Sequence, residues 1–496
     1  MAASAPAFDL CGVRVVQDPV KGKVVRSERP FAPGHVIFRE QAFVAASWST
    51  DVCSKCEELP SSGSGQASSA DSGPGCECER TGTPKPMYSS KLQATAGRRA
   101  VVVNVMKTVD GIDEVDRARC ILKCLAMYER DVYALDEVLS LAWAAQQRAM
   151  DAALQLRRQL PGIFPQGFSD AQMARLIGVL NTNAHELETL GGSGLFLSAC
   201  RMEHSCRPNC SFTTFDSTLW VTAIRAVAPG DALSIDYGNF FYRPTLERRE
   251  SLLDSYGFVC TCEACVTTAD PTRAVHCVSG TTCSEGLMLP SPVRNSTVAG
   301  KSSALDHLQF EWRCQTCGTV ADAGERTRIL AAEQELIENE FPQSLDEVDL
   351  VVRRRVLHER HYLLFWALDS IGCEAAGRAT AQRSRQELSQ VWQRIIACMN
   401  VVVPAAHHEK IIYYDNLAQV QVVLGDLAAA SRAYARAYET SCLVSGTDCS
   451  PTRKLLRLME TPPKTAEELR QLYAAEAQHR QRPSSDVEDE DTSDDE

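Results

Sequence analysis

The chain is poor in positive charge relative to its acidic content. Its 496 residues include 51 lysines and arginines against 64 aspartates and glutamates, which gives a formal net charge of −13. A sequence-independent grip on DNA is built from lysines and arginines that neutralise phosphates. The deficit therefore argues against nucleic acid as a partner, and against a zinc-dependent nucleic-acid binder as the function.

The chain also lacks long apolar runs. None approaches the length of about 18 residues that a bilayer-spanning helix needs. Residues 1–16 do not show the basic start and apolar core of a secretory signal. We therefore expect no membrane association, a location in the cytoplasm, the nucleus or both, and a monomer.

Cysteine, in contrast, is abundant, with 21 residues. Thiols of a cytosolic or nuclear protein stay reduced, so clustered cysteines there indicate metal sites rather than disulfides. The run Cys260-x-Cys262-x-x-Cys265 supplies three thiolates, whereas a tetrahedral zinc site takes four ligands. Cys206 is the candidate for the fourth, and such a closed site would be structural rather than catalytic.

Two further groups have spacing typical of metal ligands. The second group is ribbon-like and consists of Cys277, Cys283, Cys314 and Cys317. His276 is a spare candidate beside it. The third group is made of two close pairs, Cys53, Cys56, Cys76 and Cys78. Together the three groups predict two or three zinc ions per chain.

Apolar periodicity divides the chain into strand-rich and helical stretches. Strands are expected over residues 10–50 and again from Leu195 to Tyr237. Residues 57–86 are dominated by Ser, Gly and Pro, which is typical of a flexible insertion. Helices are expected over residues 113–158, 170–190 and 321–476. Ser169 or Asp170 would cap the helix over 170–190.

The C-terminal part has its own organisation. Residues 260–320 are expected to be rich in loops, and the helical stretch after them should be interrupted near Gly372, Pro404 and Gly446. Residues 416–437 look like one tetratricopeptide helix pair, a repeat that makes concave protein-binding surfaces. A protein partner is therefore expected for this helical part. Residues 484–496 hold eight carboxylates and no base, so we expect a disordered tail.

Four motifs within about seventy residues resemble the SET-domain methyltransferases, specifically their SET-and-MYND branch. The motifs are Gly194-Leu195-Phe196, His204-Ser205-Cys206-Arg207-Pro208-Asn209, Ile235-Asp236-Tyr237 and Tyr256-x-Phe258-x-Cys260-x-Cys262-x-x-Cys265. The resemblance implies an α+β multidomain protein. Its parts would be a β-rich split SET domain with a helical insertion, a zinc-bound post-SET segment, and a C-terminal helical domain of the tetratricopeptide type.

This architecture places eight segments along the chain. They are the N-terminal SET part (8–52), a degenerate MYND-like insertion (53–92), a helical SET insertion (93–185), the core SET segment (186–245), the post-SET zinc segment (246–270), a zinc-ribbon-like segment (271–320), the helical domain (321–476) and the acidic tail (477–496).

The resemblance further implies an S-adenosylmethionine-dependent protein-lysine N-methyltransferase that acts on a histone or another protein with a target lysine. Tyr237 would be the catalytic residue, since a tyrosine hydroxyl beside the transfer point can hydrogen-bond the lysine amine. The residues implied in cofactor binding are Lys21, Gly22, Asn183, Glu203, His204 and Phe258. Zinc would be the second cofactor.

Several positions depart from the pattern of this family. Glu203 stands where the family has Asn, Lys23-Val24 replaces a small Asn-Gly-like pair, and His185 replaces a Phe-like residue. The MYND-like insertion offers four candidate ligands, whereas the family finger uses eight. A buried Glu203 carboxylate would need a partner. These departures motivate an alternative hypothesis, a catalytically silent zinc-containing SET scaffold that works through its helical tail.

Overall fold

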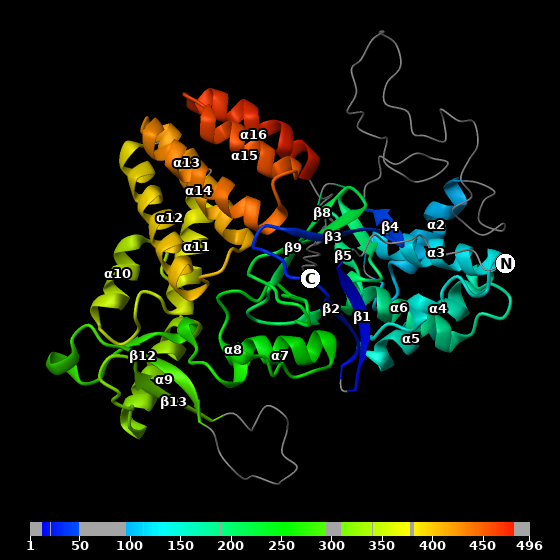
Figure 1. The fold of residues 1–496 in the computed structure, drawn as a ribbon, viewed down its shortest axis with the longest axis horizontal. Coiled ribbons are helices and arrows are strands. Elements are labelled where there is room, and N and C mark those ends of the chain that lie inside the picture. Colours follow the sequence, from blue (N-terminus) through cyan, green and yellow to red (C-terminus); the bar gives the residue numbers. More distant parts are fainter. Residues whose placement is uncertain are drawn as a thin grey trace, which may run out of the picture. The chain divides into compact units, whose positions relative to one another are not determined.

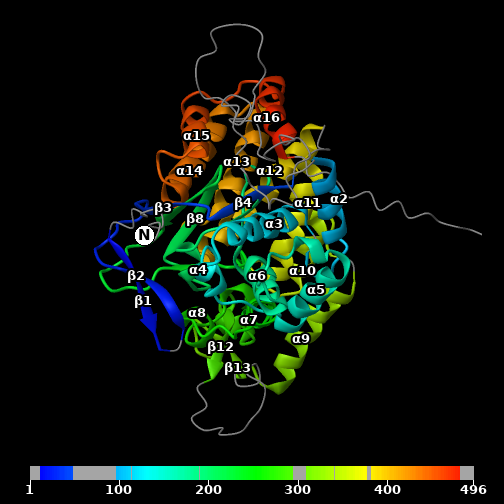
Figure 2. The same ribbon diagram turned by 90° about the vertical axis from the view of Figure 1, so that its right-hand side faces the viewer.

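The computed structural model of the protein describes residues 12–19, 21–48, 96–112, 114–188, 190–293, 309–339, 341–376 and 381–480 (Figures 1 and 2). The chain divides into two compact units. The first is built from Met1–Glu40, Ser198–Thr213 and Leu219–Arg470, and the second from Gln41–Leu197, Thr214–Thr218 and Gln471–Glu496. Strand-rich and helix-rich stretches alternate in both, so the protein has the α+β multidomain character that the sequence predicted.

The strands predicted before residue 50 and after residue 195 are confirmed. An antiparallel hairpin joins β1 (Val13–Asp18) to β2 (Gly22–Ser27). A three-stranded sheet has the order β3 (Val36–Gln41), β9 (Thr218–Ala223), β8 (Cys210–Phe215). The short strands β7 (Glu203–His204) and β10 (Ser234–Ile235) pair in parallel, and β10 leads directly to Tyr237.

The second unit combines a small sheet with a layer of helices. The sheet has the order β4 (Val44–Ser47), β6 (Gly192–Leu195), β5 (His185–Glu186). The helical elements are α2 (Ala96–Met106), α3 (Val115–Arg130), α4 (Asp136–Leu139), α5 (Gln146–Gln159), η1 (Pro161–Ile163) and α6 (Asp170–Asn183). Two long cationic side chains of α3 are buried because they donate to carbonyls of β4, Arg119 to Ser47 O and Lys123 to Ala45 O, each over 2.6 Å.

The helix predicted over residues 170–190 begins as expected but ends early. Ser169 is its N-cap, and Ser169 and Gln172 form a reciprocal capping box. The helix stops at Asn183, because His185 and Glu186 pair with β6 as β5. The prediction up to residue 190 is therefore wrong, since sheet pairing overrides the local helical pattern there.

The segment expected to be rich in loops between residues 260 and 320 contains an antiparallel sheet. Its strands are β11 (Val275–His276), β12 (Leu287–Val293) and β13 (Gln309–Cys314). Three further helical elements, α8 (Glu263–Val266), η3 (Pro271–Arg273) and η4 (Gly280–Cys283), lie in this segment, after α7 (Thr245–Tyr256). The loop prediction is wrong for these parts, because prolines and cysteines interrupt the strand pattern without preventing pairing.

The C-terminal part is helical, as predicted. Its helices are α9 (Ala323–Glu338), α10 (Leu345–Arg353), α11 (Tyr362–Ala376), α12 (Gln382–Val402), α13 (His408–Leu424), α14 (Leu427–Ser445), α15 (Ser450–Glu460) and α16 (Ala466–Arg480). Figure 1 shows α11 to α14 lying side by side. The helix pair predicted around 416–437 is confirmed as α13 and α14, and Gly425 joins them with a φ of 83° that favours glycine.

One of the predicted helix interruptions comes a few residues later than predicted, since α11 ends at Ala376 and α12 begins at Gln382. Gly372 lies inside α11, where a Cβ would come within 2.6 Å of the Trp392 ring. This glycine therefore permits close packing of α12 on α11 rather than ending the helix. The predicted breaks near Pro404 and Gly446 are confirmed, since α12 ends at Val402 and Gly446 caps α14. Across the described ranges, no helix has the length and apolar character required to cross a membrane.

Candidate active site and cysteine clusters

The candidate catalytic residue Tyr237 is fixed at three of its polar groups. Its backbone N–H donates to Nδ1 of His204 over 3.2 Å, and its hydroxyl donates to the carbonyl of Met202 over 2.5 Å. Tyr256 in turn donates from its hydroxyl to the Tyr237 carbonyl over 2.9 Å. The parallel pairing of β7 with β10 brings His204 and Tyr237 to the same end of both strands, 33 residues apart in sequence.

Aromatic rings surround the Tyr237 phenol. Its centroid lies 5.3 Å from that of His204, 5.0 Å from Tyr256 and 6.3 Å from Phe258. Gly257 ends α7 with a φ of 73°, and this turn brings Phe258 back toward the site. Burial, followed by the nearby acidic groups Cys200, Tyr256 and Glu203, raises the pKa of Tyr237 above its ordinary value. The phenol therefore stays protonated, and able to donate, at neutral pH.

Two of the residues predicted to bind the cofactor pair with each other. The Lys21 ammonium forms an ion pair with the Glu203 carboxylate, whose side chain is only 14% exposed. The Lys21 backbone is held by Asp18, and Gly22 opens β2 with a φ of 78° in the turn of the hairpin. Val24 is buried in β2, where it pairs with Val16 of β1. The carboxylate of Glu203, a position at which the sequence comparison expected Asn, thus has a partner in Lys21, 182 residues away in sequence.

Asn183 and His185 belong to the second unit. The Asn183 side chain donates to the carbonyls of Ala142 and Val179 over 2.8 and 2.9 Å, which ties the end of α6 to the preceding chain. His185 stacks edge-on to Phe196 at 5.7 Å between centroids. Burial lowers the pKa of His185 to about 4, so its ring is neutral at physiological pH. Asn183 remains a predicted cofactor ligand.

The first cysteine group comes together beside Tyr237. The sulfur atoms of Cys206, Cys260, Cys262 and Cys265 all lie within 4.8 Å of one another, and Cys206 and Cys265 are 3.5 Å apart. Tetrahedral zinc with Zn–S distances of about 2.3 Å requires sulfur–sulfur distances of roughly 3.8 Å. The arrangement is therefore able to hold one four-coordinate zinc ion. The four cysteines share a cluster of buried and partly buried side chains with Tyr237, Tyr256, Phe258 and Phe240.

Arg248 is a feature of this group that the sequence did not reveal. It is buried in α7, where its guanidinium donates to Thr245 Oγ1 over 2.9 Å and to the carbonyl of Arg243. Burial acts to lower its pKa, but Asp270, Cys206 and Cys265 outweigh that effect and raise it. Arg248 is therefore a fixed positive charge beside the thiolates. No local sequence signal could have identified it, because α7 contains a second arginine, Arg249, next to it.

The second cysteine group is held by the antiparallel sheet. The sulfur atoms of Cys277, Cys283, Cys314 and Cys317 lie within 4.8 Å of one another, with Cys277–Cys317 at 3.6 Å and Cys283–Cys314 at 3.8 Å. Cys317 is exposed. Gly286 is required here, since a Cβ would come within 2.3 Å of the Cys283 sulfur. His276 lies outside the group, and its ring lies tilted against that of His358, with 5.1 Å between the ring centroids.

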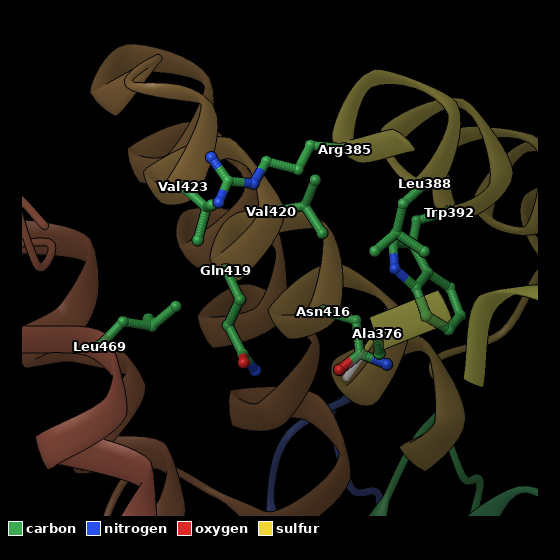
Figure 3. Close-up of a pocket in the computed structure, with 9 residues that line it drawn as sticks. All are labelled: Ala376, Arg385, Leu388, Trp392, Asn416, Gln419, Val420, Val423 and Leu469. Atoms are coloured by element: carbon green, nitrogen blue, oxygen red, sulfur yellow. The ribbon is translucent and has the colours of Figure 1, made fainter. Parts of the chain in front are cut away.

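The third cysteine group, Cys53, Cys56, Cys76 and Cys78, lies outside the described residues. A cavity of about 110 Å³ is found elsewhere, among the C-terminal helices (Figure 3). Its walls include Leu388 and Trp392 from α12, and Asn416 and Val420 from α13. It is lined by no residue predicted for catalysis or cofactor binding.

Comparison with known proteins connects these features. Residues 22–238 match the family model described as the SET domain. The SET domain-containing protein SmydA-8, isoform A, of Drosophila melanogaster is 27% identical over 329 residues, which cover 61% of this chain and 64% of that protein. The N-lysine methyltransferase SMYD2 of Rattus norvegicus is 39% identical over 83 residues, 17% of this chain and 19% of that protein. The chain thus spans less than two thirds of the length of either relative.

Solved structures show a weaker likeness. The SET domain of LSMT bound to lysine and AdoHcy aligns with 12% identity and a TM-score of 0.28, covering 94% of this chain and 95% of that one. Rubisco LSMT bound to AdoMet aligns with 12% identity and a TM-score of 0.27, covering 93% and 95%.

Proposed function

The chain belongs to the SET-and-MYND family of SET-domain proteins, and from that premise we propose that it is an S-adenosylmethionine-dependent protein-lysine N-methyltransferase. Its substrate would be a lysine side chain of a histone or another protein, and its place of action the cytoplasm, the nucleus or both. The observation that carries the proposal is the fixed, partly buried and protonated phenol of Tyr237 within its aromatic surroundings.

The residues present are of the kinds that the cofactor requires. Glu203 offers a carboxylate for an ammonium group, and the aromatic face of Phe258 offers a wall for an adenine ring. When bound, S-adenosylmethionine supplies a methyl group on a sulfonium, which is an excellent leaving group. The protein therefore has mainly to align the lysine amine and to exclude water from it.

Tyr237 would carry out that alignment. Its hydroxyl donates to the Met202 carbonyl, which directs the phenol oxygen toward the chain that enters β7. An oxygen held in this way has lone pairs left to accept a hydrogen bond from a lysine amine. Because the Tyr237 hydroxyl keeps its proton, it would act by positioning and polarising the amine rather than as an anionic base.

Zinc at the first cysteine group would support this site without taking part in the chemistry. Four thiolates leave no open coordination position on the metal. The group joins Cys206, two residues after His204, to the turn that follows Phe258. Zinc would therefore hold the two sides of the aromatic site together. The second group would hold another zinc ion as a staple of its sheet.

The ion pair between Lys21 and Glu203 supports a second candidate, the silent SET scaffold. Because Lys21 already neutralises Glu203, a cofactor ammonium would have to compete for that carboxylate. In this alternative the chain binds no S-adenosylmethionine and acts through a protein partner of its C-terminal helices. Both candidates predict zinc and the same fold, so only the cofactor and the transferred methyl group separate them.

The test is methyl transfer by the purified, zinc-loaded chain. Methyl-labelled S-adenosylmethionine is incubated with a mixture of histones and cytosolic proteins, and the modified residues are identified by mass spectrometry. We expect label on lysine, and a rate at least about 100-fold lower for Tyr237→Phe, the range in which a positioned hydroxyl contributes. Tyr256→Phe is a matched control that removes a neighbouring hydroxyl, with a smaller expected loss. Equal rates for wild type and Tyr237→Phe would contradict the proposed role of Tyr237.

A further inference from the structure

The five residues that follow Tyr237 have an unusual backbone. Asn239 and Tyr242 both adopt left-handed conformations, with φ of 52° and 56°. Residues other than glycine rarely take such values, and they persist only where the surroundings hold them in place. A short segment with two of them, immediately after the candidate catalytic residue, therefore needs contacts that fix it from both sides.

On the near side, the segment is held by its own neighbours. The Asp236 carboxylate accepts from the backbone N–H of Gly238 over 3.3 Å and from that of Phe240 over 2.8 Å. The Phe240 ring lies so close to Gly238 that a Cβ there would come within 2.2 Å of it. These contacts define the turn but do not tie it to the rest of the fold.

On the far side, the segment is anchored in the C-terminal helices. The Tyr242 ring stacks on Phe365 of α11 at 3.7 Å with an interplanar angle of 8°, and its hydroxyl donates to the Arg360 carbonyl over 3.1 Å. Tyr242 is 2% exposed and belongs to the hydrophobic core of these helices. Asn239 donates from Nδ2 to Glu409 Oε1 of α13 over 2.9 Å.

We propose that the C-terminal helices act as a positioning element for Tyr237, through the anchoring of residues 238–242 by α11 and α13. This inference rests on the proposed function, because it assigns the helices a part in the same reaction. Tyr242 is the main anchor, since its stack is buried. The hydrogen bond between Asn239 and Glu409 is exposed to solvent, so it contributes less than the Tyr242 stack to holding the segment. Tyr242, Phe365 and Glu409 are positioning residues, because none of them contacts the Tyr237 phenol.

The first arm of the test measures the segment itself and does not depend on activity. Hydrogen exchange of the amides of residues 237–242 is followed by mass spectrometry in the full, zinc-loaded chain. We expect Tyr242→Leu to raise their exchange rate at least about 10-fold through local opening, whereas Tyr242→Phe, which keeps the ring stack, stays within about threefold of wild type. Glu409→Ala should give a smaller increase, of about threefold.

Matched variants separate positioning from general stability. Glu409→Gln keeps an oxygen acceptor for Asn239 and should restore slow exchange. Glu439→Ala removes an exposed carboxylate of α14 that forms an i,i+3 ion pair with Arg436, and should change nothing in the segment. If Tyr242→Leu melts too low to be measured, the Glu409 variants still decide the question, since Glu409 is not part of the core.

The second arm measures methyl transfer. The proposal predicts that Tyr242→Leu and Glu409→Ala lower kcat in the order of their exchange rates, while their affinity for S-adenosylmethionine stays within about twofold of wild type. Unchanged exchange of residues 237–242 in both Tyr242→Leu and Glu409→Ala would overturn the proposal. A wild-type chain without transfer would refute the proposed function, and the exchange arm would still show whether the helices hold the segment.

Discussion

The two cysteine groups have the same ligand chemistry but lie in different surroundings. The first group has two buried and two partly buried cysteines and none that is exposed. It has the cation Arg248 beside it and shares its side-chain cluster with the aromatic rings around Tyr237. The second group ends in the exposed Cys317, and its neighbours are hydroxyls such as Thr319 and Ser279. It belongs to the hydrophobic core formed by β11–β13 with α9 and α11.

The difference shows that spacing identifies a ligand set, whereas the surroundings decide what the metal is for. The first group joins chain segments on both sides of the candidate active site, so its loss should affect cofactor binding. The second group joins strands of one sheet, so its loss should affect stability alone. The predictions below test this contrast.

Cys260→Ser should have the largest effect. Serine is a poor zinc ligand, so the zinc content should fall by one ion per chain, and the melting temperature should fall by roughly 10 °C. S-adenosylmethionine binding should be lost as well, since Phe258 and His204 would no longer be held together. Elemental analysis and calorimetry check this, with Cys210→Ser, a buried cysteine outside both groups, as the control. Full zinc content in Cys260→Ser would remove the basis for the first metal site.

Cys314→Ser, the matched change in the second group, should also remove one zinc ion per chain. The melting temperature should fall by about 5 to 10 °C, because β13 loses its link to Cys277 and Cys283. Affinity for S-adenosylmethionine should stay within about twofold of wild type. If cofactor binding were lost as completely as in Cys260→Ser, the contrast between the two groups would be wrong.

Glu333→Gln tests the core that supports the second group. Glu333 accepts from Arg273 and lies 2.9 Å from Nε2 of the buried His361. Although burial opposes its charge, hydrogen bonds from His361 and Arg273 lower the pKa of Glu333 to about 2 from 4.5. A depressed carboxyl pKa stabilises the fold above pH 4.5, and this contribution is lost as the pH falls through about 2.

We therefore expect Glu333→Gln to lower the free energy of unfolding by about 3 kcal/mol at pH 7, and by about half as much at pH 3. Urea unfolding at the two pH values measures the difference. Glu335→Gln, which changes an exposed carboxylate of the same helix, is the control and should have little effect. If the free energy of unfolding differed more between Glu333→Gln and wild type at pH 3 than at pH 7, the assigned direction of the pKa shift would be contradicted.

Lys21→Met should have the smallest effect. Whether it raises or lowers the affinity for S-adenosylmethionine shows what Lys21 does at the site. The Lys21 side chain is 56% exposed, so its pair with Glu203 contributes little to stability. If Lys21 competes with the cofactor ammonium, its removal should tighten S-adenosylmethionine binding by up to about fivefold. If Lys21 itself contacts the cofactor, binding should weaken instead. Calorimetry distinguishes the two outcomes, with Lys23→Met, two residues further along in β2, as the control.

The features that the sequence predicted correctly depend on short spacing. The Cys260-x-Cys262-x-x-Cys265 run, the capping residue Ser169 and the helix pair joined at Gly425 each lie within a few residues, where local geometry decides the outcome. The sequence also assigned Cys206 to this group, because a tetrahedral zinc site takes four ligands and the run from Cys260 to Cys265 supplies only three.

The features that it missed depend on packing between distant segments. The pairing of Lys21 with Glu203 and the close packing of Trp392 on Gly372 have no local signal, because the same residues elsewhere would be an exposed lysine or a helix breaker. The early end of α6 has the same origin, since β5 forms only when β6 is present to pair with it. Tertiary contacts override local preference at each of these positions.

The central claim, that the site around Tyr237 binds S-adenosylmethionine for methyl transfer, is tested most directly by calorimetry of the zinc-loaded chain with S-adenosylmethionine and with its demethylated product. We predict saturable one-to-one binding of both compounds, retained in Cys314→Ser and lost in Cys260→Ser. Absence of binding in a wild-type chain that carries its zinc and melts as a folded protein would contradict the claim and leave the silent scaffold as the function.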